Sequence, residues 1–231
     1  MKISVCLATY NGEKFIKQQI DSILKQLSAT DELIISDDGS TDNSLSIISS
    51  YQDPRIRFLT NKNKKDIARN FENALKNATG DYIFLSDQDD IWLDNKVQVI
   101  TKELQTANCI LHNAHLIDCD GEFLNKDLFS IYGTRKGYWN NIIRNTYVGC
   151  CMAFRKELIP SILPIPASIT MHDMWIALIA ERKGETKILD NNLMFYRRHD
   201  NNASTTSSKS EFSRLYQLKY RLHMLYFTLT R

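Results

Sequence analysis

The sequence predicts an α/β fold with a doubly wound, mainly parallel sheet, and three observations lead to this prediction. Through the first third of the chain, short apolar runs rich in strand-forming residues alternate with segments whose apolar residues recur at helical spacing. Gly or Pro lies at several borders between these segments. Polar clusters follow directly after the apolar runs. A β-α-β-α-β-α-β order of this kind implies parallel strands joined by crossover helices.

The first half is expected to hold four strands and three helices. The first helix begins near Glu13, where apolar residues start to recur on one face. The second follows a turn whose Ser and Thr can cap it, and the third ends at Thr79-Gly80. The expected strands are residues 3–8, 32–36, 55–60 and 82–86, the turn is 37–42, and the third helix is roughly 66–77.

The second half is less regular. A helix is expected after Trp92, and two interpretations stay open for residues 133–145, a loop over the site and an ordinary surface loop. The other expected elements are strands at 109–117, 147–155 and 193–197, a hairpin turn at 118–121 into 122–124, and a helix at 174–179.

The strand at residues 82–86 ends abruptly in Asp87, Asp89 and Asp90. Carboxylates repel one another and resist desolvation, so such a cluster is costly unless a cation lies among them. Asp-x-Asp at a strand end offers two hard oxygen ligands for Mg²⁺ or Mn²⁺. The cluster indicates an enzyme that handles a diphosphate. The alternative is a surface turn whose acids cap the next helix.

Similar polar clusters follow two other strands. Residues 9–11 are Thr-Tyr-Asn, and Asp37-Asp38 follows the second strand. In doubly wound sheets, ligands bind beyond the carboxyl ends of the strands. Three clusters at one edge of the sheet favour a ligand site over three unrelated turns.

These motifs resemble those of family-2 glycosyltransferases with the GT-A fold. The match is strong over residues 3–95, thin from there to about 170, and present again at 172–204. Residues 86–92 and 196–204 are similar to the rhamnosyltransferase-like branch of bacterial surface-polysaccharide enzymes. The motifs that carry the resemblance are Ser4–Gly12, Ile34–Asp42, Ala68–Asn70, Phe84–Trp92 and His172–Trp175.

The resemblance implies a single GT-A domain over residues 1–204. Residues 1–95 would form the nucleotide-sugar half and residues 96–204 an acceptor half with mixed strand directions. Residues 205–231 would form a linker and a C-terminal amphipathic helix. The Gln-x-x-Arg-Trp motif of processive synthases is absent, which favours transfer of one sugar per encounter.

The resemblance also assigns a donor site. Asp38 would accept the N3–H of uracil or thymine in a UDP- or dTDP-sugar, and Arg69 would lie near the diphosphate. For Tyr10, Asp38 and Arg69 the alternatives are packing on the first helix, helix capping and an exposed surface position. The nucleotide-sugar contacts implied are Thr9, Tyr10, Asn11, Asp38, Arg69, Asp87 and Gln88.

A divalent cation and a general base complete the implied site. Mn²⁺ or Mg²⁺ would be held by Asp89 and Asp87, with His199 completing the shell, and the pair Asp89 with Asp90 stays open. Asp173 would be the base that takes the proton of the acceptor hydroxyl. The default for Asp before a helix is an N-cap. The implied reaction is inverting transfer to a lipid-linked glycan in surface-polysaccharide biosynthesis.

Composition agrees with a cytoplasmic globular protein. The chain has 231 residues, 43% of them hydrophobic and 24% charged, which is ordinary for one α/β domain. A net charge of +2 gives no signal for nucleic acid as a partner. Five cysteines without a Cys-x-x-Cys pair argue against a disulfide framework. No signal peptide and no membrane-spanning apolar run are visible.

The last residues, 211–231, predict a basic, aromatic-rich helix. Three interpretations stay open for this helix: contact with the anionic inner face of the cytoplasmic membrane, packing on the domain, and pairing in a homodimer.

Two other functions compete with the glycosyltransferase. A nucleotidyltransferase would share the sheet and the paired acids, but residues 9–12 are Thr-Tyr-Asn-Gly where a basic, Gly-rich phosphate loop is expected. A catalytically silent nucleotide-sugar binding protein would not need both Asp89 and Asp173.

Overall fold

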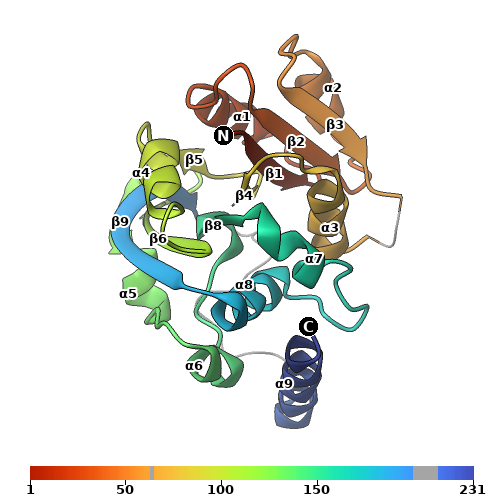
Figure 1. Cartoon of the computed structure of the whole chain (residues 1–231). Helices are drawn as coiled ribbons and strands as arrows, with labels where there is room; N and C mark the ends of the chain where they lie inside the picture. Colours follow the sequence, from red (N-terminus) through yellow and green to blue (C-terminus); the bar gives the residue numbers. More distant parts are fainter. Residues whose placement is uncertain (63–64, 200–212) are drawn as a thin grey trace.

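The computed structural model describes residues 1–62, 65–199 and 213–231, and within them one mixed sheet of nine strands runs through the molecule (Figure 1). The order along the sheet is β3-β2-β1-β4-β8-β6-β9-β5, and β7 pairs with β6. The first four strands are parallel to one another, which confirms the predicted doubly wound half. They are β1 (Ile3–Thr9), β2 (Glu32–Asp37), β3 (Ile56–Thr60) and β4 (Tyr82–Ser86).

Helices cover both faces of this half because alternate side chains of each strand point to opposite faces. Val5 and Leu7 of β1 pack in one apolar cluster with α1 (Ile16–Leu24) and α2 (Ser44–Ser49). Cys6 packs in the other cluster with α3 (Ile67–Asn77). The period of two in the strands therefore builds two cores, one on each side of the sheet.

The second half of the sheet has mixed directions, as expected. β8 is antiparallel to β4 and to β6, and β9 is parallel to β6. The carboxyl ends of β6 and β9 therefore lie at the same edge as those of β1, β2 and β4. The bounds are β5 (Ile91–Trp92), β6 (Cys109–Ile117), β7 (Phe123–Asp127), β8 (Met152–Arg155) and β9 (Thr186–Arg197).

Four details differ from the expected elements. The strand expected from Tyr147 starts only at Met152, because Gly149–Cys151 forms a 3-10 turn. β9 begins at Thr186, well before the apolar run at 193–197, and the two-residue β5 was not predicted. Residues 133–145 contain α6 (Tyr138–Ile143), which packs against α8 and α9, so the prediction of a loop was wrong.

The remaining helices lie in the second part of the chain, after β5. Residues 174–180 of α8 are buried on every side, so this helix forms the centre of its layer. Figure 1 shows α9 beside α8 at one end of the molecule, with α2 and β3 at the other. The bounds are α4 (Lys96–Glu103), α5 (Leu128–Tyr132), a 3-10 turn Lys156–Leu158, α7 (Ile159–Ile162), α8 (His172–Lys183) and α9 (Arg214–Leu229).

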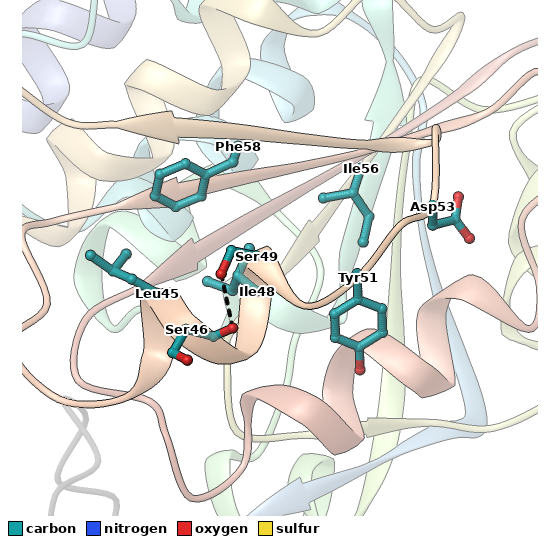
Figure 2. A pocket seen from close by; sticks show the side chains of 8 residues that line it. All are labelled: Leu45, Ser46, Ile48, Ser49, Tyr51, Asp53, Ile56 and Phe58. Carbon is teal, nitrogen blue, oxygen red and sulfur yellow. Dashed lines mark hydrogen bonds between the residues drawn. The ribbon is translucent and has the colours of Figure 1, made fainter.

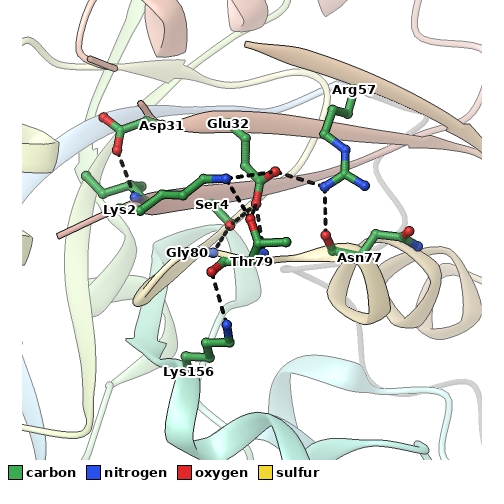
Figure 3. Close-up of polar contacts among 10 residues, drawn as sticks. Lys2, Ser4, Asp31, Glu32, Arg57, Asn77, Thr79, Gly80 and Lys156 are labelled. Atoms are coloured by element: carbon green, nitrogen blue, oxygen red, sulfur yellow. Dashed lines mark hydrogen bonds and ion pairs between the residues drawn. The ribbon is translucent and has the colours of Figure 1, made fainter. Parts of the chain in front are cut away.

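A buried carboxylate, Glu32, fastens the amino ends of the strands together (Figure 3). It accepts hydrogen bonds from Ser4 Oγ at 2.5 Å, from Thr79 N at 2.8 Å and from Arg57 Nη1 at 2.9 Å. Lys2 Nζ lies 3.5 Å from the same carboxylate. Burial alone would raise the pKa of Glu32, but these hydrogen bonds outweigh burial and lower the pKa to about 2. The end of the sheet opposite the predicted site is thereby fixed.

Glu32→Gln should lower the free energy of unfolding by about 2–3 kcal/mol at pH 7, because buried donors lose a charged acceptor. The folded-state pKa lies below the ordinary 4.5, so the contribution of Glu32 is complete above pH 4.5 and is lost as the pH falls toward about 2. Urea unfolding should show a difference between the two proteins that shrinks from pH 7 to about pH 3. Glu157→Gln, at an exposed glutamate, is the matched control and should change little. An undiminished difference at low pH would contradict this account.

Candidate functional site

Gln88 holds the ends of β1 and β4 together. Its side-chain oxygen accepts hydrogen bonds from Thr9 Oγ1 at 2.7 Å and from Tyr10 N at 2.9 Å, and its Nε2 donates to Tyr10 O at 3.1 Å. A side chain at Gly12 would place Cβ 2.4 Å from that same oxygen, so any other residue there would displace the Gln88 amide from Thr9 and Tyr10. The amide of Gln88 thus shapes the loop after β1.

Tyr10 and Asn11 lie at the tip of this loop. The ring of Tyr10 is 46% exposed, and Lys65 Nζ lies 4.8 Å from its centroid. Asn11 has a positive φ of 49° and accepts a hydrogen bond from Thr41 N through Oδ1, while its own N–H donates to Ser40 Oγ. Asn11 therefore fixes the loop, and the ring of Tyr10 is exposed for stacking.

Asp38 lies where β2, β3 and α3 meet. Its Oδ1 accepts a hydrogen bond from Asn61 Nδ2 at 2.8 Å, and its Oδ2 accepts one from Asp66 N at 3.0 Å. Each carboxylate oxygen can accept a second hydrogen bond, so one acceptor position per oxygen remains for a ligand. Asp37 instead accepts from Gly39 N and Ser40 N and forms the turn.

Arg69 is used in a way that the sequence did not predict. Its Nη1 donates to Glu72 Oε2 and to Ile165 O at 2.7 Å, and its Nη2 donates to Pro166 O at 3.1 Å and to Ile169 O at 3.2 Å. All four terminal N–H groups therefore have acceptors inside the protein. The geometry gives no support to a contact between Arg69 and a diphosphate. The guanidinium instead donates to backbone carbonyls of the segment before α8.

The acids after β4 are crowded. Asp90 is 1% exposed, its Oδ1 accepts from Arg197 N at 3.0 Å, and its Oδ2 has no hydrogen-bond partner among the described residues. Ligand atoms of Asp87, Asp90 and Cys150 lie within 4.8 Å of one another. Burial, then the charge of Asp89 and that of Asp173, raises the pKa of Asp87 to about 7. Such a cluster favours a bound cation, which would lower these pKa values.

The donor atoms decide which of these residues suits a divalent cation. A hydrogen bond with Cys151 and burial raise the pKa of Cys150 well above its ordinary value, and a neutral thiol is a poor ligand for Mg²⁺ or Mn²⁺. Asp87 and Asp89 are partly exposed carboxylates, and Asp89 Oδ2 lies 2.8 Å from His199 Nε2. The acids that follow β4 therefore fit a divalent cation, with Asp89 and Asp87 more open to it than the buried Asp90.

Lys96 is a buried cation close to the acids, and its burial was not predicted. Its Nζ donates to Cys150 O at 3.0 Å and lies 4.1 Å from the centroid of the Trp92 ring. Burial lowers the pKa of Lys96 to about 8, while Asp90 and Asp87 oppose this shift. A lysine at the start of a helix normally lies at the surface, so only the fold reveals this position.

Arg197, the last residue of β9, binds the acidic turn, which is residues 87–90 after β4. Its Nε donates to Asp89 O at 2.9 Å, and its Nη1 donates to the carbonyls of Asp118 and Cys119. Its Nη2 donates to Gln18 Oε1 at 2.8 Å. These contacts of Arg197 hold three segments of the chain together at the site.

Asp173 lies in the first turn of α8, and the N-cap position is Met171. The interpretation of Asp173 as the N-cap was therefore wrong, although its Oδ1 accepts from Met174 N at 2.7 Å. Burial raises the pKa of Asp173 to about 6, and its charge in turn raises the pKa of Asp87. The helix thus brings a carboxylate of raised pKa to the acids after β4.

A surface pocket of about 590 Å³ lies elsewhere, between α2 and β3 (Figure 2). Its one charged lining residue, Asp53, pairs with Arg55 at 2.6 Å. None of the predicted site residues lines it. The chemistry therefore points to the edge formed by the ends of β1, β2 and β4 and not to this pocket.

Comparisons with known proteins agree with this geometry. Residues 4–163 match the family model described as glycosyl transferase family 2. The Escherichia coli protein UDP-Glc:alpha-D-GlcNAc-diphosphoundecaprenol beta-1,3-glucosyltransferase WfgD is 34% identical over 64% of this chain and 57% of its own length. The Shigella flexneri dTDP-rhamnosyl transferase RfbG is 29% identical over 90% of this chain and 78% of its own length.

A solved structure supports the fold. The S. aureus TarS fragment 1–349 in complex with UDP-GlcNAc has a TM-score of 0.71 at 18% identity, and the match covers 100% of this chain and 73% of that one. The mixed sheet with its C-terminal helix is consistent with the GT-A fold.

Asp89→Asn should weaken binding of Mn²⁺ by about tenfold or more, because a charged ligand contributes about 1.5–3 kcal/mol. Isothermal titration of the protein with MnCl₂ measures this loss. Asp94→Asn, at an exposed acid nearby, is the matched control and should bind like the unmodified protein. Equal affinity in all three proteins would exclude Asp89 as a ligand.

Proposed function

Because this chain belongs to glycosyl transferase family 2, we propose that it is an inverting glycosyltransferase that moves one sugar from a UDP- or dTDP-linked donor to a lipid-linked glycan. One observation carries the proposal: the half-buried Asp173 lies against the Gly149–Cys151 turn, and Cys150 of this turn lies beside Asp87 and Asp90 at the end of β4. A base on one side and ligands for a diphosphate–metal complex on the other are what a single displacement at an anomeric carbon requires.

The donor would bind along the ends of β1 and β2. Asp38 would accept the N3–H of the pyrimidine at an acceptor position that Asn61 and Asp66 leave unused. The exposed ring of Tyr10 would stack on the base or ribose. The names of WfgD and RfbG specify UDP-Glc and dTDP-rhamnosyl donors, which supports a pyrimidine nucleotide as the donor of this chain.

Asp173 would take the proton of the acceptor hydroxyl during the displacement. With a pKa of about 6 it is mostly ionised at pH 7.5, and it is a stronger base than an ordinary aspartate. Mn²⁺ or Mg²⁺, when held by Asp89 and Asp87, would neutralise the leaving diphosphate. Gln88 and Arg197 would keep the loop after β1 and the acidic turn in place.

The acceptor would be a lipid-linked saccharide at the inner face of the cytoplasmic membrane. The name of WfgD, which specifies a diphosphoundecaprenol acceptor, supports this assignment. No helix within residues 1–62, 65–199 and 213–231 combines the length and apolar content needed to cross a bilayer. The protein would therefore reach such an acceptor by peripheral contact.

The outer face of α9 suits that contact. Its inner face packs on the domain through the buried Met224 and Thr228. Arg214 and Lys219 flank the outer face. In a pair of identical helices these cations would repel each other, whereas an anionic lipid surface would attract them, so we favour the lipid surface as the partner. The outer face consists of exposed side chains three or four residues apart, Leu215, Leu218, Leu222, Tyr226 and Leu229.

Exchange of Leu218 and Leu222 for Gln should reduce binding to phosphatidylglycerol vesicles at least about tenfold. Each leucine that becomes buried in the lipid surface contributes about 1.5–3 kcal/mol to binding. Vesicle co-sedimentation measures this, with phosphatidylcholine vesicles for the contribution of charge. Leu45→Gln, at an exposed leucine of α2, is the control. If the double variant instead turns a dimer into a monomer in light scattering and leaves vesicle binding unchanged, α9 pairs with a second subunit.

Asp173→Asn keeps the size of the side chain but cannot accept a proton. Turnover should fall by roughly 10²–10⁴-fold, the usual contribution of general-base catalysis, while donor binding persists. Transfer from UDP- and dTDP-sugars to a lipid-linked saccharide, followed by NMR of the product, measures both the rate and the anomeric configuration. Asp120→Asn, at an exposed acid, is the control. A retained anomer or a nearly normal rate would contradict the proposal.

A further inference from the structure

The segment that leads into Asp173 is held from two sides. Arg69 of α3 binds three of its carbonyl groups, as described above. From the other side, the hydroxyl oxygen of Tyr220 on α9 accepts hydrogen bonds from Thr170 N at 3.2 Å and from Met171 N at 2.9 Å. These are the last two N–H groups before α8 begins at His172.

Tyr220 supports the backbone just before α8 and does not cap the helix itself. The first N–H groups of a helix have no partner within the helix, and a side-chain cap usually satisfies one of them. α8 has Met171 at its N-cap and no side-chain cap hydrogen bond. A single phenol oxygen from a distant helix accepts from both residues that precede the first turn, and Asp173 lies in that turn.

Few other contacts fix this turn. The ring of His172 stacks on Phe71 at 4.1 Å, but its Nε2 is buried without a hydrogen-bond partner among the described residues. Trp175 Nε1 donates to Ile162 O at 2.9 Å one turn later. Among the described residues, the side-chain hydrogen bonds to the backbone of residues 169–171 therefore come from Arg69, at the Ile169 carbonyl, and from Tyr220, at the two N–H groups that follow.

We propose that Tyr220 is a positioning residue that holds the start of α8, and with it the carboxylate of Asp173, in register with the acidic turn after β4. The inference rests on the proposed role of Asp173 as the base. A displacement of about 1 Å at a catalytic group can cost on the order of 10²-fold in rate, so two hydrogen bonds at this point matter for turnover. Tyr220 acts through the backbone and does not touch the reacting atoms.

Tyr220→Phe removes only the hydroxyl group and tests the proposal. Turnover should fall about tenfold, the equivalent of one to two hydrogen bonds, with the KM for the donor unchanged. Amide hydrogen exchange of a peptide covering residues 165–175 should become faster. Tyr51→Phe is the matched control, since it also removes a hydrogen-bonded hydroxyl group, which donates to Asp21 Oδ1 at 2.6 Å far from α8. Tyr51→Phe should change neither turnover nor exchange.

The outcomes separate this inference from the proposed function. If exchange at 165–175 accelerates and turnover stays normal, Tyr220 is structural only and the inference is overturned. A loss of turnover that a lower assay temperature restores, together with a lower melting temperature, also overturns it. Asp173→Asn is assayed in parallel: if it too retains normal turnover, the proposed base fails, whereas a slow Asp173→Asn variant beside a normal Tyr220→Phe variant removes the inference alone.

Discussion

The crowding of three carboxylates at the end of β4 is the constraint on which the rest of the site depends. Asp87 and Asp90 share a region that includes Cys150, and burial pushes their pKa values upward. Two cations lie near these acids: Lys96 is buried next to them, and Arg197 donates to the backbone of the turn. The crowding is reduced but not removed, because the pKa values of Asp87 and Asp90 stay raised, and a divalent cation would stabilise the ionised acids.

The parallel half of the fold could be predicted from the sequence almost residue by residue. β4 spans Tyr82–Ser86 as expected, because a buried parallel strand shows as a continuous apolar run between turn signals. The two-residue β5 and the early start of β9 at Thr186 could not be predicted, since they depend on pairing with distant strands. Two residues are too few to show a strand period, and Asp190, Asn191 and Asn192 interrupt the apolar pattern of β9.

The site shows the same division. The clusters at residues 9–11, 37–38 and 87–90 come together because the carboxyl ends of parallel strands share an edge. The partners of Arg69 could not be predicted, because they are backbone carbonyls nearly one hundred residues away. Lys96 was missed for a similar reason: its charge is exceptional only when the side chain is enclosed.

The continuity of the sheet has a mechanical consequence. β4 of the first half of the chain pairs directly with β8 of the second half, and through β8 the hydrogen-bonded ladder continues to β6 and β9. A hinge between the halves would have to break that ladder, which is buried between two apolar cores. The distance between Asp173 and the edge formed by the carboxyl ends of β1, β2 and β4 is therefore set when the chain folds. Substrates of different length must be accommodated by the loops at the edge, and the frame behind them behaves as one stiff body.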